Sequence, residues 1–251
     1  MKIGMIGGGA IAQFLLQTDV NVQSVLVRDL DKYQFLKEQY EVELYSEVEK
    51  FLKSNIDLVV EAANIEAVKE YLPKVITKKD AIIISIGAFS DEAFLKEMEK
   101  KAKTYHKNIY LPSGAIGGID LLENAHALNG VDEVKITTRK PAETLIDENI
   151  TKEKVVFSGS AKEAINQFPK NINVSIVLSL AGLGVDETKV NIIADPHITK
   201  NEHTIEIKGT FGTSTITVTN EPMKENPKTS YLAALSVLGT IKRLANPIKI
   251  G

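Results

Sequence analysis

Hydrophobic and polar positions follow two different patterns along the chain, and the change falls near Pro112. In the first half, short apolar runs alternate with longer segments whose apolar positions recur every three or four residues. Short apolar runs are typical of strands buried in a parallel sheet, and the longer period is typical of helices. Strands alternating with helices predict a doubly wound parallel sheet over residues 1–110. The expected strands are Ile3–Ile6, Val22–Val27, Val42–Tyr45, Asp57–Ala63, Ala81–Ile86 and Asn108–Leu111.

Capping residues place several helices between these strands. Asp31 is expected to cap a helix that runs to about Gln39. Ser46 and Glu49 have the spacing of a capping box for a helix that runs to Leu52. The other helices of this half are expected over Ala10–Leu16, Ile65–Val75 and Ser90–Ala102.

Beyond Pro112 the runs lengthen and alternate between apolar and polar residues. Such alternation buries one face of a strand and leaves the other in water, which favours an antiparallel or mixed sheet. The expected strands are Glu133–Arg139, Lys154–Phe157, Lys189–Ala194, Thr204–Lys208 and Ser214–Val218. The expected helices are Ile119–Ala127, Ala161–Phe168 and Ile172–Leu183. The pattern predicts an α+β domain over residues 111–227, then an amphipathic helix over 228–245 that packs back on the first domain.

Composition excludes several classes of function. Net charge is −3, so no basic surface for nucleic acid is expected. No apolar stretch approaches the roughly 18 residues of a membrane span, and no cleavable signal pattern opens the chain. Cysteine is absent, which excludes disulfides, thiol nucleophiles and cysteine-bound metal. These observations favour a cytoplasmic protein without membrane or nucleic-acid partners.

The first strand leads directly into three glycines and then a helix, the order of a dinucleotide-binding unit. Gly7 is expected to make the tight turn, and Gly9 to let the backbone approach a pyrophosphate at the helix N-terminus. Ala10 and Ile11 open that helix and are expected to join in cofactor binding. Asp29 follows at about the distance of the ribose-binding acid, roughly 20 residues.

The end of the second strand leaves the choice of cofactor open. An acidic residue there binds the ribose 2′-hydroxyl and favours NAD, whereas an arginine accepts a 2′-phosphate and favours NADP. Arg28 comes directly before Asp29, and neighbouring strand residues point to opposite faces. We therefore predict use of NAD or NADP, with a lean toward NADP.

Four histidines are candidates for proton transfer. His106 ends a lysine-rich helix and is expected to be solvated, and His126 is expected to be a satisfied core or interface histidine. His197 and His203 flank a loop between two strands, a common place for sites. Asp195 and Pro196 form a turn signal in the same loop, so a purely structural loop is the alternative. The spacing matches no zinc or iron motif, and no metal site is predicted.

Two further stretches have the composition of ligand-binding segments. Small residues over 113–118 let the backbone reach a ligand ring, and the following helix N-terminus can hold a carboxylate; an interdomain turn is the alternative. Asn171 and Asn173 flank the start of a helix, where one is expected to cap the helix and the other to reach the cleft.

Taken together, these blocks resemble the L-aspartate dehydrogenase family of NAD(P)-dependent enzymes. They occur in the family's order and cover most of the chain. Beside the glycine loop, the matching blocks are Ser113–Asp120, Thr138–Pro141, Phe168–Val174, Ala194–Pro196, Asn201–His203, Gly209–Gly212 and Asn226–Ser230.

The resemblance implies oxidative deamination of L-aspartate by hydride transfer to NAD(P)⁺. The product, iminoaspartate, feeds pyridine nucleotide biosynthesis or hydrolyses to oxaloacetate and ammonia. By motif, Ala115 and Asn173 match positions that contact the nicotinamide cofactor, and His203 matches the active-site histidine. The resemblance also implies a homodimer.

The residue types suit that chemistry. A histidine with a pKa near neutrality can take a proton from the substrate amine. The substrate carboxylates need cationic or N–H partners, and Arg139, Lys140 and Asn201 are predicted to bind the substrate, with the helix N-terminus after Gly118 as a further candidate.

Two alternatives remain from the sequence. One is another NAD(P)-dependent imine or semialdehyde reductase of similar layout, resembling dihydrodipicolinate reductase or homoserine dehydrogenase. The other is a non-catalytic dinucleotide-sensing module, although a sensor does not need the Asn201–His203 block.

Overall fold

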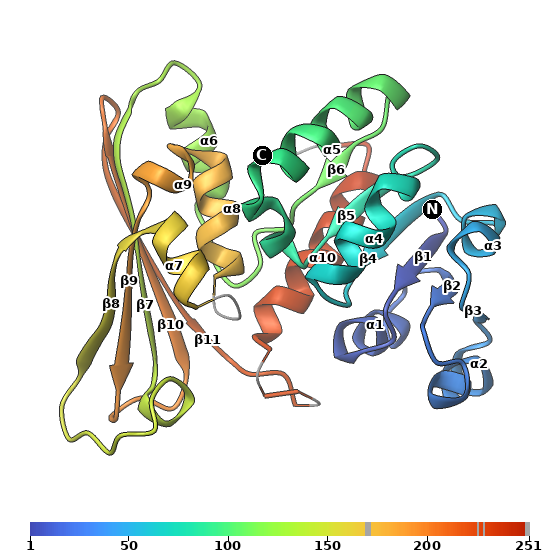
Figure 1. Cartoon of the computed structure of the whole chain (residues 1–251), viewed down its shortest axis with the longest axis horizontal. Coiled ribbons are helices and arrows are strands. Elements are labelled where there is room, and N and C mark those ends of the chain that lie inside the picture. Colours follow the sequence, from blue (N-terminus) through green and yellow to red (C-terminus); the bar gives the residue numbers. More distant parts are fainter. Residues whose placement is uncertain (169–171, 225, 228, 249–251) are drawn as a thin grey trace. The chain divides into compact units, whose positions relative to one another are not determined.

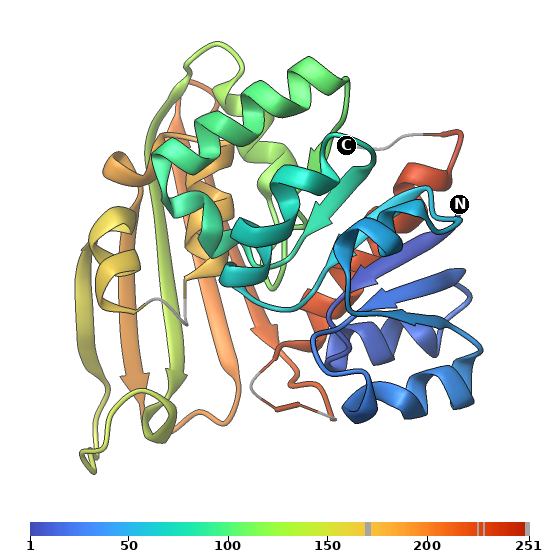
Figure 2. The ribbon, with the colours of Figure 1, turned by 45° about the vertical axis from the view of Figure 1, so that its right-hand side comes forward.

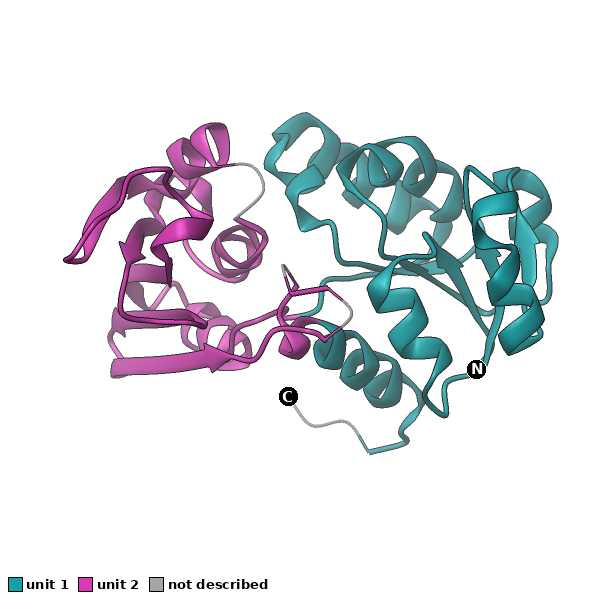
Figure 3. Ribbon diagram, turned by 90° about the horizontal axis from the view of Figure 1, so that it is seen from below, with its two compact units in different colours: residues 1–112, 234–250 teal, residues 113–233, 251 magenta. Residues whose placement is uncertain are grey.

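The computed structural model describes residues 1–168, 172–224, 226–227 and 229–248. The chain divides into two compact units, shown in teal and magenta in Figure 3. Unit 1 comprises Met1–Pro112 and Ala234–Ile250, and unit 2 comprises Ser113–Ala233.

Unit 1 is built on a six-stranded parallel sheet in the order β3-β2-β1-β4-β5-β6. This order reverses direction on the two sides of β1, which confirms the doubly wound sheet expected from the alternating pattern. Figure 2 shows β1, β2 and β3 side by side in blue. The strands are β1 (Ile3–Ile6), β2 (Val22–Leu26), β3 (Glu43–Tyr45), β4 (Leu58–Glu61), β5 (Asp80–Ile83) and β6 (Ile109–Tyr110).

Helices connect these strands (Figure 1). Their apolar stripes are buried against the sheet; in α4, for example, Val68, Leu72 and Val75 are buried while the charged positions face solvent. The helices are α1 (Ala10–Leu16), η1 (Asp31–Tyr33), α2 (Gln34–Tyr40), α3 (Val48–Lys53), α4 (Ile65–Val75), η2 (Ile86–Ser90) and α5 (Glu92–Tyr105).

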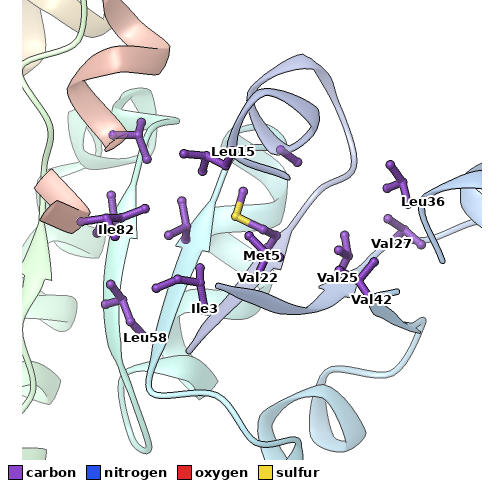
Figure 4. Packing of buried hydrophobic residues seen from close by; sticks show 14 residues of the cluster. Ile3, Met5, Leu15, Val22, Val25, Val27, Leu36, Val42, Leu58 and Ile82 are labelled. Atoms are coloured by element: carbon purple, nitrogen blue, oxygen red, sulfur yellow. The ribbon is translucent and has the colours of Figure 1, made fainter. Parts of the chain in front are cut away.

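The last helix, α10 (Tyr231–Ala245), returns to the first unit, as expected. Val237 and Ile241 are buried in one cluster with Ile3, Met5 and Leu15. The labelled members of this cluster, drawn in Figure 4, come from strands and helices on both sides of β1. Burying a large aliphatic side chain contributes about 1.5–3 kcal/mol, so α10 is part of the hydrophobic core of unit 1.

Unit 2 contains a five-stranded mixed sheet in the order β11-β10-β7-β9-β8. Only the β7–β9 pair is parallel, which agrees with the expected antiparallel or mixed sheet. The strands are β7 (Val131–Pro141), β8 (Lys154–Ser160), β9 (Lys189–Asp195), β10 (Asn201–Gly209) and β11 (Gly212–Asn220). The helices are α6 (Ile119–His126), η3 (Ala142–Thr144), α7 (Ala161–Gln167), α8 (Asn173–Ala181) and α9 (Gly184–Glu187).

The two faces of this sheet differ sharply in polarity. Helices α6 to α9 lie on one face, where Ile136, Ile205 and Ile207 are fully buried (Figure 1). The opposite face carries ion pairs between neighbouring strands, such as Lys135 with Glu206. Alternation along each strand therefore gives one apolar and one charged face.

Some local predictions are wrong. The predicted capping box at Ser46 and Glu49 does not form: α3 begins at Val48, Glu47 is its N-cap residue, and no side chain caps it. Asp31 lies inside η1 and does not cap the helix; the Asp29 carboxylate instead accepts a hydrogen bond from the Lys32 amide.

The single helix predicted over Ile172–Leu183 is also wrong. It is interrupted at Gly182, so that α8 ends at Ala181 and the short helix α9 follows it. Asn171, expected either to cap this helix or to reach the cleft, lies with Pro169 and Lys170 outside the described residues.

Candidate active site

The glycine loop between β1 and α1 lies at the base of a cleft in unit 1. Gly7 has φ +98°, in the region that favours glycine, and a Cβ there would lie 2.9 Å from the carbonyl oxygen of Ala62. Gly9 has open space where a Cβ would stand, so a ligand can approach the backbone. Both glycines line a cleft of about 370 Å³.

The residues expected to select the cofactor line the same cleft. Arg28 and Asp29 line it together with Lys32 and Tyr33. Arg28 and Asp29 are both exposed, and the Asp29 carboxylate accepts the Lys32 amide hydrogen bond at 3.0 Å. Both a cation and an acid are therefore available in the cleft.

Ala10 and Ile11, also expected in the cofactor site, form the first turn of α1 and do not line the cleft. The first N–H groups of a helix have no intrahelical acceptor. Any contribution of these two residues would therefore come from the backbone.

His203 lies near the start of β10, on the helix-covered face of the unit 2 sheet. Its side chain is 5% exposed, and its Nδ1 lies 2.9 Å from the hydroxyl oxygen of Thr138, the residue opposite it on β7. Burial, and then the nearby Lys140 ammonium, lower the pKa of His203 to about 4. His203 is therefore neutral at neutral pH and has a ring lone pair available, but its pKa lies well below the near-neutral value expected from the residue type.

Lys140 follows two residues after Thr138 on β7 and so projects from the same face as His203. The lysine is partly buried, and burial lowers its pKa below the ordinary range. The charge of Lys140 lowers the pKa of His203, so these two predicted site residues are close enough to interact electrostatically.

Arg139 points to the opposite, charged face of the sheet. Its guanidinium pairs with Glu153 and, at 2.9 Å, with Asp195, and its Nε lies 3.9 Å from Glu202. The hydrogen bonds to these first two carboxylates raise the pKa of Arg139. The structure thus separates Arg139 from the His203 and Lys140 pair.

The loop after Pro112 is fixed by a side chain from the end of β11. Buried Asn220 donates a hydrogen bond from Nδ2 to the carbonyl oxygen of Ala115 at 3.1 Å and accepts one from the hydroxyl of Ser230. Gly118, the N-cap residue of α6, has φ +77°, and a Cβ there would lie 2.2 Å from the Ile216 side chain. The Asn220 hydrogen bond therefore ties Ala115 to β11, and the absence of a side chain at Gly118 leaves room for Ile216 on the same strand.

Asn201 and Asn173 occupy different elements of unit 2. Asn201 opens β10 opposite Asn220, and it is two residues from His203 on the same strand face. Asn173 is the exposed first residue of α8.

The other histidines are apart from this group. The backbone amide of exposed His197 donates to Asp195. His126 is not a satisfied core histidine, because its buried Nδ1 has no hydrogen-bond partner in the described part of the chain, and the alternative of an interface histidine stays a prediction. Among the described residues, no cluster of three or more His, Asp or Glu side chains is arranged to hold a metal ion.

Sequence reasoning missed the structural roles of three of the buried polar residues: Glu61, Thr138 and Asn220. Glu61 is the most visible in retrospect, because it is the one carboxylate in the otherwise apolar run from Leu58 to Ala63. Thr138 and Asn220 carry no comparable signal, since their roles depend on pairing with strands distant in sequence.

A glycine-loop cleft in a doubly wound unit, combined with an α+β unit, defines a protein of the two-domain dehydrogenase class. The crystal structure of apo scyllo-inositol dehydrogenase from Lactobacillus casei shares this fold, with a TM-score of 0.62, 12% identity, and coverage of 100% of this chain and 89% of that one. At that identity the likeness concerns the fold alone.

Closer relatives narrow the class to one family. Residues 3–112 match the model described as homoserine dehydrogenase, NAD binding domain, and residues 120–244 match aspartate dehydrogenase, C-terminal. The L-aspartate dehydrogenases of Methanocaldococcus jannaschii and Methanococcoides burtonii are 39% and 40% identical over 100% of this chain and 99% of theirs. The crystal structure of Thermotoga maritima aspartate dehydrogenase has a TM-score of 0.85 at 32% identity, covering 100% of this chain and 99% of that one. The chain belongs to the L-aspartate dehydrogenase family, which confirms the resemblance seen in the sequence.

Proposed function

We propose that the protein oxidises L-aspartate at the Cα–N bond with NAD(P)⁺. The iminoaspartate formed enters pyridine nucleotide biosynthesis or hydrolyses to oxaloacetate and ammonia. The observation that carries this proposal is the 39% identity to an L-aspartate dehydrogenase over the whole chain. Buried His203 and partly buried Lys140 supply groups that fit the chemistry.

The dinucleotide fits the cleft of unit 1, because the open space at Gly9 and the positive φ of Gly7 suit a pyrophosphate close to the backbone. When bound there, NAD(P)⁺ would supply the hydride acceptor for oxidation of the substrate α-carbon. Gly7, Gly9 and the amides of Ala10 and Ile11 are proposed to hold the phosphates. Ala115 and Asn173 are proposed as the nicotinamide-side contacts.

His203 is proposed as the general base. It takes a proton from the substrate ammonium, so that the nitrogen lone pair can form the C=N bond as hydride leaves the α-carbon. For this role Nδ1–H donates to the Thr138 hydroxyl, which leaves the Nε2 lone pair for the substrate. Once Nε2 has released this proton to solvent, its lone pair is free again to accept a proton from the water that adds to the imine carbon.

Lys140 is proposed to bind a substrate carboxylate, with Asn201 as a neutral partner. A carboxylate beside a partly buried ammonium compensates the cost of its burial. Arg139 was the other cationic candidate from the sequence, where Lys140 had the alternative of a solvated strand end; the existing pairs of Arg139 with Asp195 and Glu153 compete with a substrate carboxylate.

We further place the protein in the cytoplasm, where NAD(P) pools are available, as a homodimer without nucleic-acid partners. The charged face of the unit 2 sheet, with ion pairs such as Lys135–Glu206, is the surface proposed to meet a second copy. For the part of the chain that the structure describes, no helix is both long and apolar enough to cross a membrane. Sedimentation velocity at micromolar concentration should show a species of twice the chain mass of 27.5 kDa.

The activity is tested by absorbance at 340 nm with L-aspartate and either NAD⁺ or NADP⁺. Aspartate-dependent formation of reduced cofactor is expected. Activity with homoserine and none with aspartate would favour the reductase alternative, which the N-terminal family match keeps relevant. Tight cofactor binding without turnover of any amino or hydroxy acid would favour a sensing module.

Cofactor preference is expected to depend on Arg28. Arg28→Ala should raise the KM for NADP⁺ by about 10-fold and change that for NAD⁺ by less than about 2-fold, since an exposed charge-assisted contact is worth about 1–2 kcal/mol. Michaelis constants for both cofactors measure this. The neighbouring Asp29→Asn variant tests the opposite preference: it should raise the KM for NAD⁺ and leave the KM for NADP⁺ unchanged. An unchanged NADP⁺ to NAD⁺ ratio in Arg28→Ala would remove Arg28 from the site.

A further inference from the structure

Unit 1 contains a carboxylate that the proposed chemistry does not use. Glu61 is the last residue of β4 and is 1% exposed. Burial of a carboxylate without compensation costs several kcal/mol, so its position requires a physical explanation. Its surroundings provide one.

Three hydrogen-bond donors converge on the Glu61 carboxylate. The Ala63 amide donates to Oε1 at 2.8 Å, the Ser85 hydroxyl donates to Oε1 at 2.9 Å, and the Ser85 amide donates to Oε2 at 3.0 Å. The donors come from two different loops, those that follow β4 and β5. The side chain thus fastens two neighbouring loops at the carboxyl ends of adjacent parallel strands.

One of these loops forms a wall of the dinucleotide cleft. Ala62, Ala63 and Asn64 all line that cleft, and the carbonyl oxygen of Ala62 lies where a Cβ on Gly7 would collide. The far end of the loop is fixed separately, because Asn64 caps α4 by accepting from the Ala67 amide at 2.8 Å. Glu61 therefore determines where the near end of the loop lies against the glycine turn.

We propose that Glu61 is a positioning residue for dinucleotide binding, acting through the 62–64 loop. The inference rests on the proposed function only in taking NAD(P) as the ligand of this cleft. Loops at the carboxyl ends of strands form the binding crevice in folds of this kind. A fixed loop keeps the cleft preformed, so the loop loses less conformational entropy when the cofactor binds.

Direct binding measurements test the proposal without requiring catalysis. Titration of NADH or NADPH, followed by cofactor fluorescence, gives the Kd for wild type and for Glu61→Gln. The amide has nearly the same shape but turns an N–H₂ donor toward one of the three converging donors. We expect the Kd to rise about 10-fold. At saturating cofactor, the KM of Glu61→Gln for aspartate should stay within about 2-fold of the wild-type value.

Two serine variants keep the test decisive if Glu61→Gln folds poorly. Ser85→Ala removes one donor from Glu61, and Ser85 itself does not line the cleft. Its Kd is expected to rise by about 2- to 10-fold. Ser24→Ala is the matched control, because Ser24 is 1% exposed and bonds Ser54 at 2.9 Å in the same unit, away from the cleft. It should lose similar thermal stability and keep the wild-type Kd.

The outcomes separate the two proposals. Glu61→Gln and Ser85→Ala proteins that melt lower but bind cofactor as wild type does would overturn the positioning role and leave the proposed function intact. A wild-type protein that binds neither NADH nor NADPH would refute the proposed function and this inference with it.

Discussion

His203→Ala is expected to lower kcat for aspartate oxidation by about 10³-fold, within the range of about 10²–10⁴ for losing a general base. The cofactor Kd should be retained, because His203 does not line the glycine-loop cleft and its side chain is proposed to act on the substrate rather than to hold the cofactor. Steady-state kinetics with NADH titration measures both quantities. His197→Ala is the matched control, since that residue is exposed and its hydrogen bond to Asp195 comes from the backbone amide, which the substitution keeps. Near-normal kcat in His203→Ala would refute the catalytic assignment.

The pKa of His203 adds a stability signature to the same variant. The folded-state value of about 4 lies below the ordinary value of 6.5, so the unfolded chain takes up this proton first as the pH falls. The stability contributed by burying the neutral ring is therefore present above pH 6.5 and lost between 6.5 and 4. Urea unfolding at pH 7.5 and pH 5 should show a smaller acid-induced loss for His203→Ala than for wild type.

Lys140→Gln is expected to raise the KM for aspartate by about 100-fold, the effect of removing a partly desolvated charge-assisted contact of about 2–3 kcal/mol. It should also raise the pKa of His203, because the lysine charge is one of the two causes that lower it. Histidine-selective NMR titration of a protein with four histidines can resolve this shift.

The same two measurements on Arg139→Gln distinguish the two candidate cations. Arg139 lies on the other strand face and is paired with Asp195 and Glu153, so its loss should leave the pKa of His203 unchanged and affect the aspartate KM less. A larger KM effect from Arg139→Gln than from Lys140→Gln would reverse the proposed assignment.

The fold was predictable because periodicity and burial agree along most of the chain. The run from Leu58 to Val60 is buried on both faces, as its unbroken apolar sequence indicates. Strand β10 alternates between buried odd and wetter even positions, as its alternating sequence indicates. Patterns of this kind need no knowledge of distant residues.

Local capping signals were less reliable, because several arrangements compete for the same few amides. At α3 the chain begins the helix after Glu47, which leaves the Ser46 signal unused. The interruption at Gly182 is a different case: a Cβ there would lie 3.0 Å from Leu122, so the glycine serves a close approach to α6.

The candidate site was only partly predictable for a related reason. The residues His203 and Lys140 were marked by their type and by family resemblance. That these two side chains lie near each other could not be predicted, because it depends on the pairing of β10 with β7. His203 faces Thr138 across 65 residues of sequence, and the register between distant strands cannot be read from either strand alone.

The placement of α10 has a consequence for how the protein is made. Val237 and Ile241 complete the core of unit 1, yet they follow nearly all of unit 2 in the sequence. During synthesis, the apolar surface over β1 and α1 therefore stays uncovered until unit 2 has been made. A chain truncated within unit 2 lacks these two residues, so the truncation damages the core of the unit whose strands were synthesised earlier.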